Sequence, residues 1–394
     1  MAHYRSQSGK TISKIIPSTV APSSAAIGTM WYNTATGITY QYTTDGASEF
    51  WLDISSGGIG TRTGSADIVG ETDPHLETST TGAGLAIGTT YYNRATDRYF
   101  TCTNTTTNGN QWSGRYAGFG GIETMYKSGT SFYRVHTFLS DGLFHMDTTT
   151  SCDILTVGGG GGGAGAHPTA WGEGGGGAGA VRATAGHSLG AKTYTITVGK
   201  GGGGGHSYIY SNSGRPGLNG GDTFLDTNTL IANGGQGAES SATTPTNSGN
   251  GSGAGGSSNG SKAGGAGGTY GNAGGAGTAT GEKPGGGGGA GGAGQTGAAG
   301  GAGGAGAANN YRTGSNITYG GGGGGGTNPG AGGSGGGGAG WNDGSSGDPL
   351  AGTMDGDANT GGGGGGTHGQ SANKEDDWGG YGGSGIVVIR YLVA

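Results

Sequence analysis

The stretch GGAGQTGAAGGAGGAGAA, residues 291–308, contains almost no side chain larger than a methyl group. Alanines in and around it recur three residues apart, as in the pairs Ala290 and Ala293, and Ala302 and Ala305. Three residues make one turn of a polyproline II helix, which has no internal hydrogen bonds. Alanines at this spacing lie on one ridge and leave two faces of glycine. Neighbouring chains can approach those faces closely enough to exchange backbone hydrogen bonds.

Glycine supplies 108 of the 394 residues, and 89 of these glycines follow Val157. Composition alone permits disorder, because such a chain buries too little apolar surface to offset its ordering entropy. A collagen helix is excluded, since strict Gly-X-Y is absent and the chain holds only nine prolines. An α-helix is disfavoured because glycine costs about 1 kcal/mol per residue relative to alanine. The ordered alternative, which we predict, is a bundle of polyglycine II helices with little or no α-helix.

The first 156 residues have ordinary composition and contain an internal repeat. AIGTMWYNTATGITYQYT (26–43) aligns without gaps to AIGTTYYNRATDRYFTCT (86–103), with nine identities in eighteen positions. Each copy has two strand-like runs around a short turn and is followed by a run containing Trp51 or Trp112. We therefore predict two three-stranded β-meanders, each too small to be stable alone.

Further strand-like runs continue from Tyr133, and the last, GIVVIRYLV (385–393), follows roughly 150 glycine-dominated residues. This order predicts a β-sandwich whose closing strand comes after a long insertion. The predicted chain is thus all-β. Its parts are an extended attachment arm (1–25), a first meander (26–60), a linker (61–85), a second meander (86–120) and a glycine-rich domain (121–394), whose jelly-roll-like sandwich strands (132–233 and 385–393) flank a polyglycine II insertion (234–384).

Charge and hydropathy restrict the partners. Only 11% of the residues are charged and the net charge is −6, which disfavours nucleic acid. No run approaches ~20 apolar residues, so neither membrane insertion nor a secretion signal is expected. Cys102 and Cys152 are expected to be buried free thiols of a reducing compartment, a disulfide between them being the alternative.

Chemical motifs are weak. GHSLG (186–190) matches the G-x-S-x-G pattern around Ser188, but a strand-like run follows where the nucleophile elbow needs a helix. Asp355, Asp357 and Asn359 resemble half of a calcium loop, with a solvated turn as the alternative. Lys200 is followed by glycine rather than by the Ser or Thr of a phosphate-binding loop. The histidines show no metal-ligand spacing. We expect no enzyme, no cofactor and no metal.

Segments 239–250, 308–319, 341–355 and 371–378 interrupt the glycine and hold most of its aromatic and charged residues. Loops on a rigid scaffold are typical of recognition. The candidate receptor-binding residues are Tyr270, Tyr311, Arg312, Tyr319, Trp341, Asp343 and Trp378. The alternative is that these side chains, and Trp171, only cap the ends of the helices.

Two segments carry a family resemblance. GTMWYNTATGITYQYTTDG followed by WLDIS resembles hairpin repeats in tail-fibre proteins of marine bacteriophages, particularly cyanophages. CDILTVGGGGGGAGAHPTAWGEGGGGAGAVRATAG with GIVVIRY resembles the glycine-rich domain of phage tail proteins. It is also similar in type to the polyglycine tip of T-even-type phage adhesins and to the extracellular glycine-rich domain of the anaplastic lymphoma kinase receptor family. The resemblance implies polyglycine II helices held by a β-sandwich, with receptor contacts made by loops at the helix ends.

From this we expect a virion protein, assembled in the host cytoplasm and placed on the phage particle surface as a tail fibre or fibre-tip adhesin. Its N-terminal region would attach to other tail or capsid proteins, and its loops would bind a host cell-surface glycan or outer-membrane protein. Meanders too small to fold alone favour a homotrimer. The alternatives are a capsid-mounted fibre or minor tail protein without a receptor, a polysaccharide-cleaving enzyme, and an ice-binding bundle, whose flat Thr/Ala face the sequence does not show.

Overall fold

The computed structural model of the chain describes residues 16–23, 25–27, 29–34, 38–44, 49–53, 67–78, 85–96, 98–114, 116–166, 171–206, 215–226, 229–240, 251–327, 329–342, 353–369 and 378–393. The regular elements among these residues are β-strands, apart from the short 3₁₀ turn η1 (Gly297–Ala299). The all-β prediction is therefore confirmed. Two compact units divide the chain: residues 1–71 with 79–105, and residues 72–78 with 106–394. No helix in the described part is long and apolar enough to cross a membrane.

The N-terminal part contains two four-stranded sheets of the same design. The first has the order β1 (Ile16–Ser18), β2 (Met30–Asn33), β3 (Ile38–Thr44) and β4 (Glu49–Asp53). The second has the order β5 (Ile68–Gly70), β6 (Thr90–Asn93), β7 (Arg98–Asn104) and β8 (Gln111–Gly114). β2–β3–β4 is the three-stranded meander expected from the repeat. The parallel first strands β1 and β5 are additions that the sequence did not indicate.

Aromatic side chains form the small core of the first sheet. The ring of Trp31 stacks on Tyr40 with centroids 4.7 Å apart and meets Trp51 edge-on at 5.6 Å. The indole N–H of Trp31 donates to the carbonyl of Ser18, which joins the extra strand to the meander. In the second sheet Phe100 is 1% exposed. Each repeat therefore relies on a few aromatic contacts instead of an extended core.

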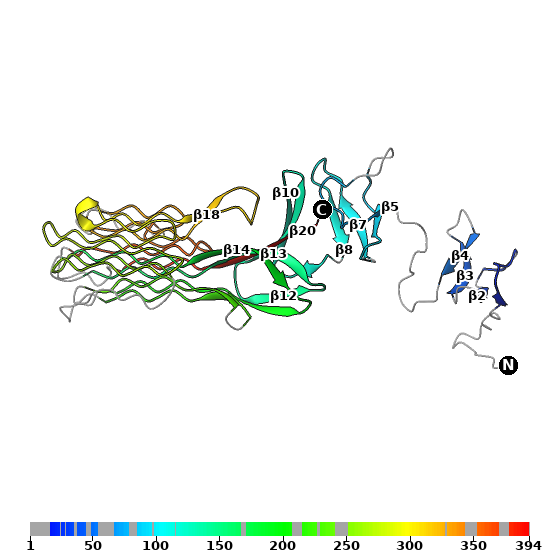
Figure 1. The fold of residues 1–394 in the computed structure, drawn as a ribbon, viewed down its shortest axis with the longest axis horizontal. Coiled ribbons are helices and arrows are strands. Elements are labelled where there is room, and N and C mark those ends of the chain that lie inside the picture. The colour runs from blue at the N-terminus through cyan, green and yellow to red at the C-terminus, as the bar shows by residue number, and fades with distance from the viewer. Residues whose placement is uncertain are drawn as a thin grey trace. The chain divides into compact units, whose positions relative to one another are not determined.

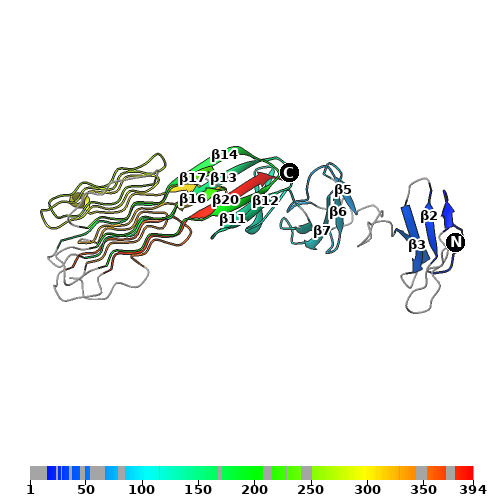
Figure 2. The same cartoon turned by 90° about the horizontal axis from the view of Figure 1, so that it is seen from below.

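A β-sandwich forms the centre of the second unit (Figure 2). One sheet has the order β10 (Ile122–Ser128), β11 (Ser131–Phe138), β20 (Ile386–Leu392), β13 (Thr150–Val157) and β14 (Val181–Leu189). The other has the order β17 (Thr229–Ala232), β16 (Thr223–Leu225), β15 (Thr193–Thr197), β12 (Gly142–Met146) and β9 (Gly118–Phe119). The last strand, β20, lies between β11 and β13. This sheet is therefore completed only by residues that follow the glycine-rich insertion.

The two sheets of the sandwich pack through alternate residues of their strands. The ring of Phe144 on β12 lies 4.9 Å from His136 and 6.2 Å from Phe138, both on β11 of the opposite sheet. Phe144 is fully buried, and so are Ile196 and Ile389. This layer is a conventional hydrophobic core.

Glycine-rich segments run side by side away from the sandwich (Figure 1), and their backbone hydrogen bonds repeat every three residues. Residues 158–166 show the pattern. Their N–H groups donate in rotation to three segments: Gly158, Gly161 and Ala164 to 171–180, Gly159, Gly162 and Gly165 to 215–222, and Gly160 and Gly163 to 378–385. Their carbonyls accept from three more, 198–206, 233–240 and 361–369. A helix with three residues per turn and six bonded neighbours is polyglycine II packing.

Only glycine fits where these helices touch. A Cβ atom placed on Gly163 would lie 2.0 Å from the carbonyl oxygen of Gly365, and one on Gly176 would lie 2.2 Å from that of Gly161. By contrast, several of the alanines at the three-residue spacing, including Ala263, Ala266 and Ala273, are exposed at the surface of the bundle. Ala164, Ala238 and Ala254 form a small buried cluster. The predicted arrangement of methyl ridges and glycine faces is present.

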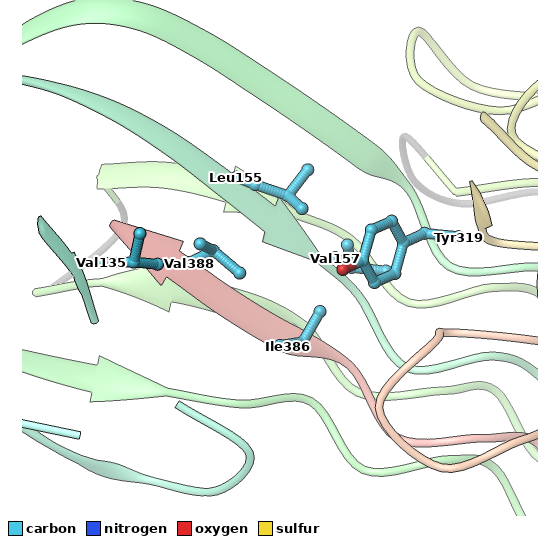
Figure 3. Close-up of a cluster of buried hydrophobic side chains, with 6 residues drawn as sticks. All are labelled: Val135, Leu155, Val157, Tyr319, Ile386 and Val388. Atoms are coloured by element: carbon cyan, nitrogen blue, oxygen red, sulfur yellow. The ribbon is translucent and has the colours of Figure 1, made fainter. Parts of the chain in front are cut away.

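One hairpin of the insertion returns to the sandwich (Figure 1). β18 (Ala307–Asn309) and β19 (Ile317–Tyr319) pair antiparallel. The ring of Tyr319 lies against the face of the β11–β20–β13 sheet that points away from the other sheet (Figure 3). The buried cluster there comprises Val135, Leu155, Val157, Tyr319, Ile386 and Val388. The hairpin thus closes a second hydrophobic layer and fastens the bundle to the sandwich.

Candidate functional site

The glycine helices reverse direction at two ends, and the predicted aromatic residues divide between them. We call the end that adjoins the sandwich strands the sandwich end. There the carbonyl of Tyr270 accepts a hydrogen bond from the N–H of Val181, the first residue of β14, at 3.3 Å. The outer end is the one that contains η1 and the bridge between Thr278 and Lys283 (Figure 1). A binding role at either end requires side chains that are still exposed.

Four of the predicted residues lie at the sandwich end. Arg182 lies over the ring of Tyr270 at 5.5 Å. Tyr311 is half-buried and belongs with Tyr319 to the layer on the outer face of the sheet. Tyr319 is 1% exposed; burial raises the pKa of its hydroxyl, and the nearby positive charge of Arg312 opposes that rise.

Arg390 on β20 links the β18–β19 hairpin to the sandwich. Its guanidinium lies 4.1 Å from the ring centre of Tyr311 and 4.5 Å from that of Tyr133. It also pairs with the carboxylate of Asp153 on β13 at 2.9 Å and donates to the hydroxyl of Tyr126 on β10. Cation–π contacts and a charge-assisted pair of this kind fix the hairpin to three strands. Segment 308–319 thus lies at the sandwich end of the bundle, where Tyr311 and Tyr319 pack on the sheet. Its part in receptor binding stays a prediction.

Trp341 and Trp378 lie at the outer end, and Asp343 is outside the described residues. The N–H of Trp341 donates to Gly366, and its carbonyl accepts from the N–H of His368. The imidazole of His368 is buried, with Nδ1 3.2 Å from Oδ1 of Asn342 and Nε2 3.2 Å from Oε2 of Glu282. These polar contacts join three neighbouring glycine segments behind Trp341. They give the outer end a fixed shape.

Exposed apolar side chains gather beside Trp378. Trp378 is 45% exposed and Tyr381 is 51% exposed. Since they are three residues apart, both point from the same side of their helix, about 9 Å apart at ~3.1 Å rise per residue. The ring of His206 meets Trp378 edge-on, with centroids 4.3 Å apart.

Leu218 completes this surface from another segment and is 64% exposed. A Cβ atom on Gly203 would lie 3.5 Å from Cδ1 of Leu218 and 4.0 Å from Cε1 of Tyr381. Leu218 and Tyr381 therefore stand on either side of the glycine helix that contains Gly203. We call Trp378, Tyr381, His206 and Leu218 the aromatic ridge.

Sequence reasoning found Trp378 in this ridge and missed the other three residues. Tyr381 stands between glycines only three residues from Trp378, and that spacing was the available signal. Leu218 and His206 come from other segments. Nothing in a glycine sequence indicates which segments become neighbours.

The weak chemical motifs take structural roles in the described residues. Ser188 lies inside β14, and β15 follows, so the strand-to-helix elbow of a serine nucleophile is not formed. Asp355 accepts from the N–H of Tyr381, and Asn359, at φ +61°, contacts Ser384. No group of three or more His, Cys, Asp or Glu residues in the described ranges could hold a metal ion.

The two thiols are free and buried, as the sequence led us to expect. Burial raises the pKa of Cys152 to about 12, with a smaller contribution from the negative charge of Asp153. Burial also raises the pKa of Cys102. Thiols held in the protonated form are poor nucleophiles.

Comparison with known proteins identifies the C-terminal part. The profile of the glycine-rich domain family matches residues 140–392, which run from β12 through the bundle to the end of β20. The chain belongs to this family. A search of curated proteins found no match.

Proposed function

We propose that the chain is a virion structural protein, a tail fibre or fibre-tip adhesin of a bacteriophage that presents its glycine bundle to a host cell-surface receptor. The observation that carries this proposal is the aromatic ridge. Trp378 and Tyr381 are large and about half exposed, and both stand on a glycine-rich segment of the bundle. Exposed aromatic side chains on a rigid support are the residues that most often dominate binding energy.

The bundle is suited to presenting such residues. Each of its helices is bonded to its neighbours through the backbone at every turn, so the side chains it carries have fixed positions. A rigid platform lowers the entropy lost on binding. The receptor chemistry that fits the ridge is a glycan or an outer-membrane protein with an apolar face.

The N-terminal repeats fit the attachment role in this proposal. Their sheets are small and rely on a few aromatic contacts, so they gain most from packing on other virion proteins or on copies of themselves. We therefore propose a homotrimer on the surface of the particle. We propose no catalytic activity, no cofactor and no nucleic-acid partner.

The test is adsorption of particles that carry the double variant Trp378→Ala and Tyr381→Ala. Loss of two central aromatic contacts, each worth about 2 kcal/mol, is expected to lower the affinity for the receptor by about 700-fold if their contributions add, and by at least about thirtyfold if only one of them is lost. The control is Leu143→Ala, which shortens an apolar side chain that is 62% exposed on β12 of the sandwich, outside both the aromatic ridge and the N-terminal sheets. Normal adsorption of the double variant would overturn the receptor-binding role.

One observation favours a second candidate, a capsid-mounted fibre or minor tail protein without a receptor. Tyr311 and Tyr319 serve the packing of the hairpin and not an exposed surface. If the bundle is only a stable terminal plug, the variants at the ridge will be silent while the protein is still required for assembly. Imaging of the labelled chain on particles separates a head position from a tail position.

A further inference from the structure

A cavity of about 420 Å³ is lined by residues of β8 and of the sandwich strands β9, β10 and β11, away from the glycine bundle. Its lining includes Arg134 on β11, which pairs in register with Tyr391 near the C-terminal end of β20, whereas the bundle joins β20 at Ile386. The volume is within the range of pockets that take small molecules. All lining residues belong to the second unit: Ser113, Gly114, Tyr116, Gly118, Phe119, Glu123 and Arg134.

The charged side chains in this lining are one carboxylate and one guanidinium, bonded to each other. Arg134 and Glu123 form an ion pair, and their side chains are 16% and 30% exposed. Holding an ion pair in a partly dehydrated place is costly and adds little to stability. The pair therefore needs an explanation other than stability.

Buried polar groups hold the pair in place. The N–H of Gly120 donates to Oε1 of Glu123 at 3.2 Å, and the carbonyl of the same residue lies 2.9 Å from Nδ1 of His136. Because a carbonyl can only accept, Nδ1 of His136 carries the proton. The hydroxyl of Tyr391 accepts from the N–H of Gly118 at 3.0 Å. His136 on β11 and Tyr391 on β20 thus hold the backbone at the rim of the cavity in place.

Aromatic rings form the apolar part of the wall. The guanidinium of Arg134 lies 4.0 Å from the ring centre of Tyr116, whose hydroxyl donates to the carbonyl of Pro74 at 3.0 Å. One face of the guanidinium is thereby covered. Phe119 is 48% exposed, and its ring lies 4.8 Å from that of His145.

We propose that this cavity binds a neutral pyranose ring. A sugar presents neighbouring hydroxyls that each donate and accept, and Glu123 beside Arg134 offers a fixed acceptor next to a fixed donor. The apolar face of the ring stacks on Phe119. The site is separate from the aromatic ridge, and the inference does not depend on the proposed receptor role of the bundle.

Charge selects the neutral ligand over an anionic one. Glu123 already neutralises Arg134, so a carboxylate or sulfate would meet a negative charge beside the positive one. A purely apolar ligand would displace water from the pair and return no hydrogen bonds, which costs free energy. A small polyhydroxyl ring avoids both costs, because it carries no charge and returns hydrogen bonds to the ion pair.

The experiment measures binding of the methyl pyranosides of glucose, galactose and mannose to the full chain by saturation-transfer NMR. We expect at least one to bind saturably in the millimolar range, which is typical of one small ligand with few contacts. Phe119→Ala is expected to weaken binding about tenfold or more. Because Phe119 is half exposed, this variant is expected to fold, which an unchanged unfolding midpoint checks.

A second comparison tests the preference for a neutral ligand. The wild type is expected to bind the neutral glycoside more tightly than the corresponding methyl glucuronide, and Glu123→Gln is expected to reverse that order. Leu392→Ala, which shortens a side chain that is 55% exposed on β20 and does not line the cavity, is expected to leave glycoside binding unchanged. The proposal is overturned if none of the three glycosides binds, if Phe119→Ala binds as the wild type does, or if the wild type prefers the glucuronide.

Discussion

The sandwich and the glycine bundle are stabilised by different interactions. In the sandwich, side chains such as Phe144 and Ile389 fill the space between two sheets, and backbone hydrogen bonds run within each sheet. In the bundle, side chains are nearly absent from the contacts, and hydrogen bonds run to neighbours on all sides. The comparison shows that a dense interior does not require large apolar residues, provided that every backbone group finds a partner.

The two regions also differ in what a mutation can do. Shortening a side chain leaves a cavity in the sandwich. The bundle has almost no side chains to shorten, and its helices are damaged by adding atoms. Four predictions test this difference between the sandwich and the bundle. They are given from the largest expected effect to the smallest.

The largest effect is expected at the junction. Tyr319→Ala removes a ring that is 1% exposed against the sheet, which is expected to cost about 3–5 kcal/mol of unfolding free energy. Chemical unfolding followed in both regions is expected to change from one transition to two. Tyr270→Ala, at the same end but only half-buried, is the control and is expected to cost less than about 1 kcal/mol. Equal effects would mean that the hairpin does not join the two regions.

A pH effect is expected in the sandwich. Burial lowers the pKa of His136 from 6.5 to about 4, partly opposed by its hydrogen bond to Gly120 and the charge of Glu123. Below about pH 6.5 the imidazole of His136 binds a proton in the unfolded chain but not in the folded one. The unfolding free energy is therefore highest above about pH 6.5 and falls as the pH drops toward about 4. The loss is at most about 3 kcal/mol.

The measurement is the unfolding free energy of the wild type and of His136→Asn across this pH window. Asparagine keeps a donor for the carbonyl of Gly120 and does not titrate there. The wild type is expected to lose stability more steeply than the variant. Parallel curves would show that His136 is not held neutral.

An added methyl separates tight from open positions in the bundle. Gly163→Ala places a Cβ 2.0 Å from a backbone oxygen and is expected to cost about 1–3 kcal/mol or more. Gly292→Ala is the matched control, since the nearest atom to its Cβ is 3.6 Å away. Thermal melting of the two variants is the readout. If both behave alike, close packing of backbones is not what holds the bundle.

A removed methyl is expected to have the smallest effect. Ala254 is buried in the alanine cluster, whereas Ala263 is exposed on a ridge. Both changes to glycine carry the same cost in chain entropy, so their difference reports the buried methyl, about 1 kcal/mol. Unfolding curves of Ala254→Gly and Ala263→Gly measure it. A difference near zero would indicate that the cluster is not packed.

Much of the fold could be predicted because the physical signals are local. The three-residue spacing of alanines such as Ala263 and Ala266 indicates the helix type directly. The apolar run at 385–393 indicates a buried strand, and its place at the end of the chain indicates an insertion before it. The repeat at 26–43 and 86–103 likewise indicated its hairpins.

The position of each loop could not be predicted, because it depends on how often the chain reverses before it. Glycine segments carry no side chain that marks their neighbours or their direction. For this reason the sequence predicts that the segment containing Tyr311 lies at an end of the bundle, but not that it packs on the sandwich. The partners of Trp378 in the aromatic ridge were missed for the same reason, since Leu218 comes from a segment distant in sequence. The pocket around Arg134 likewise has no local motif.

Amide hydrogen exchange across residues 158–165 and 175–180 tests the central claim most directly. These segments lie inside the bundle, and their N–H groups donate to neighbouring backbone carbonyls. The account predicts that they exchange as slowly as the amides of β13 and β20 in the sandwich, through the same opening of the whole structure. Exchange at the rate of an unstructured glycine peptide would show that backbone hydrogen bonding does not hold the bundle together.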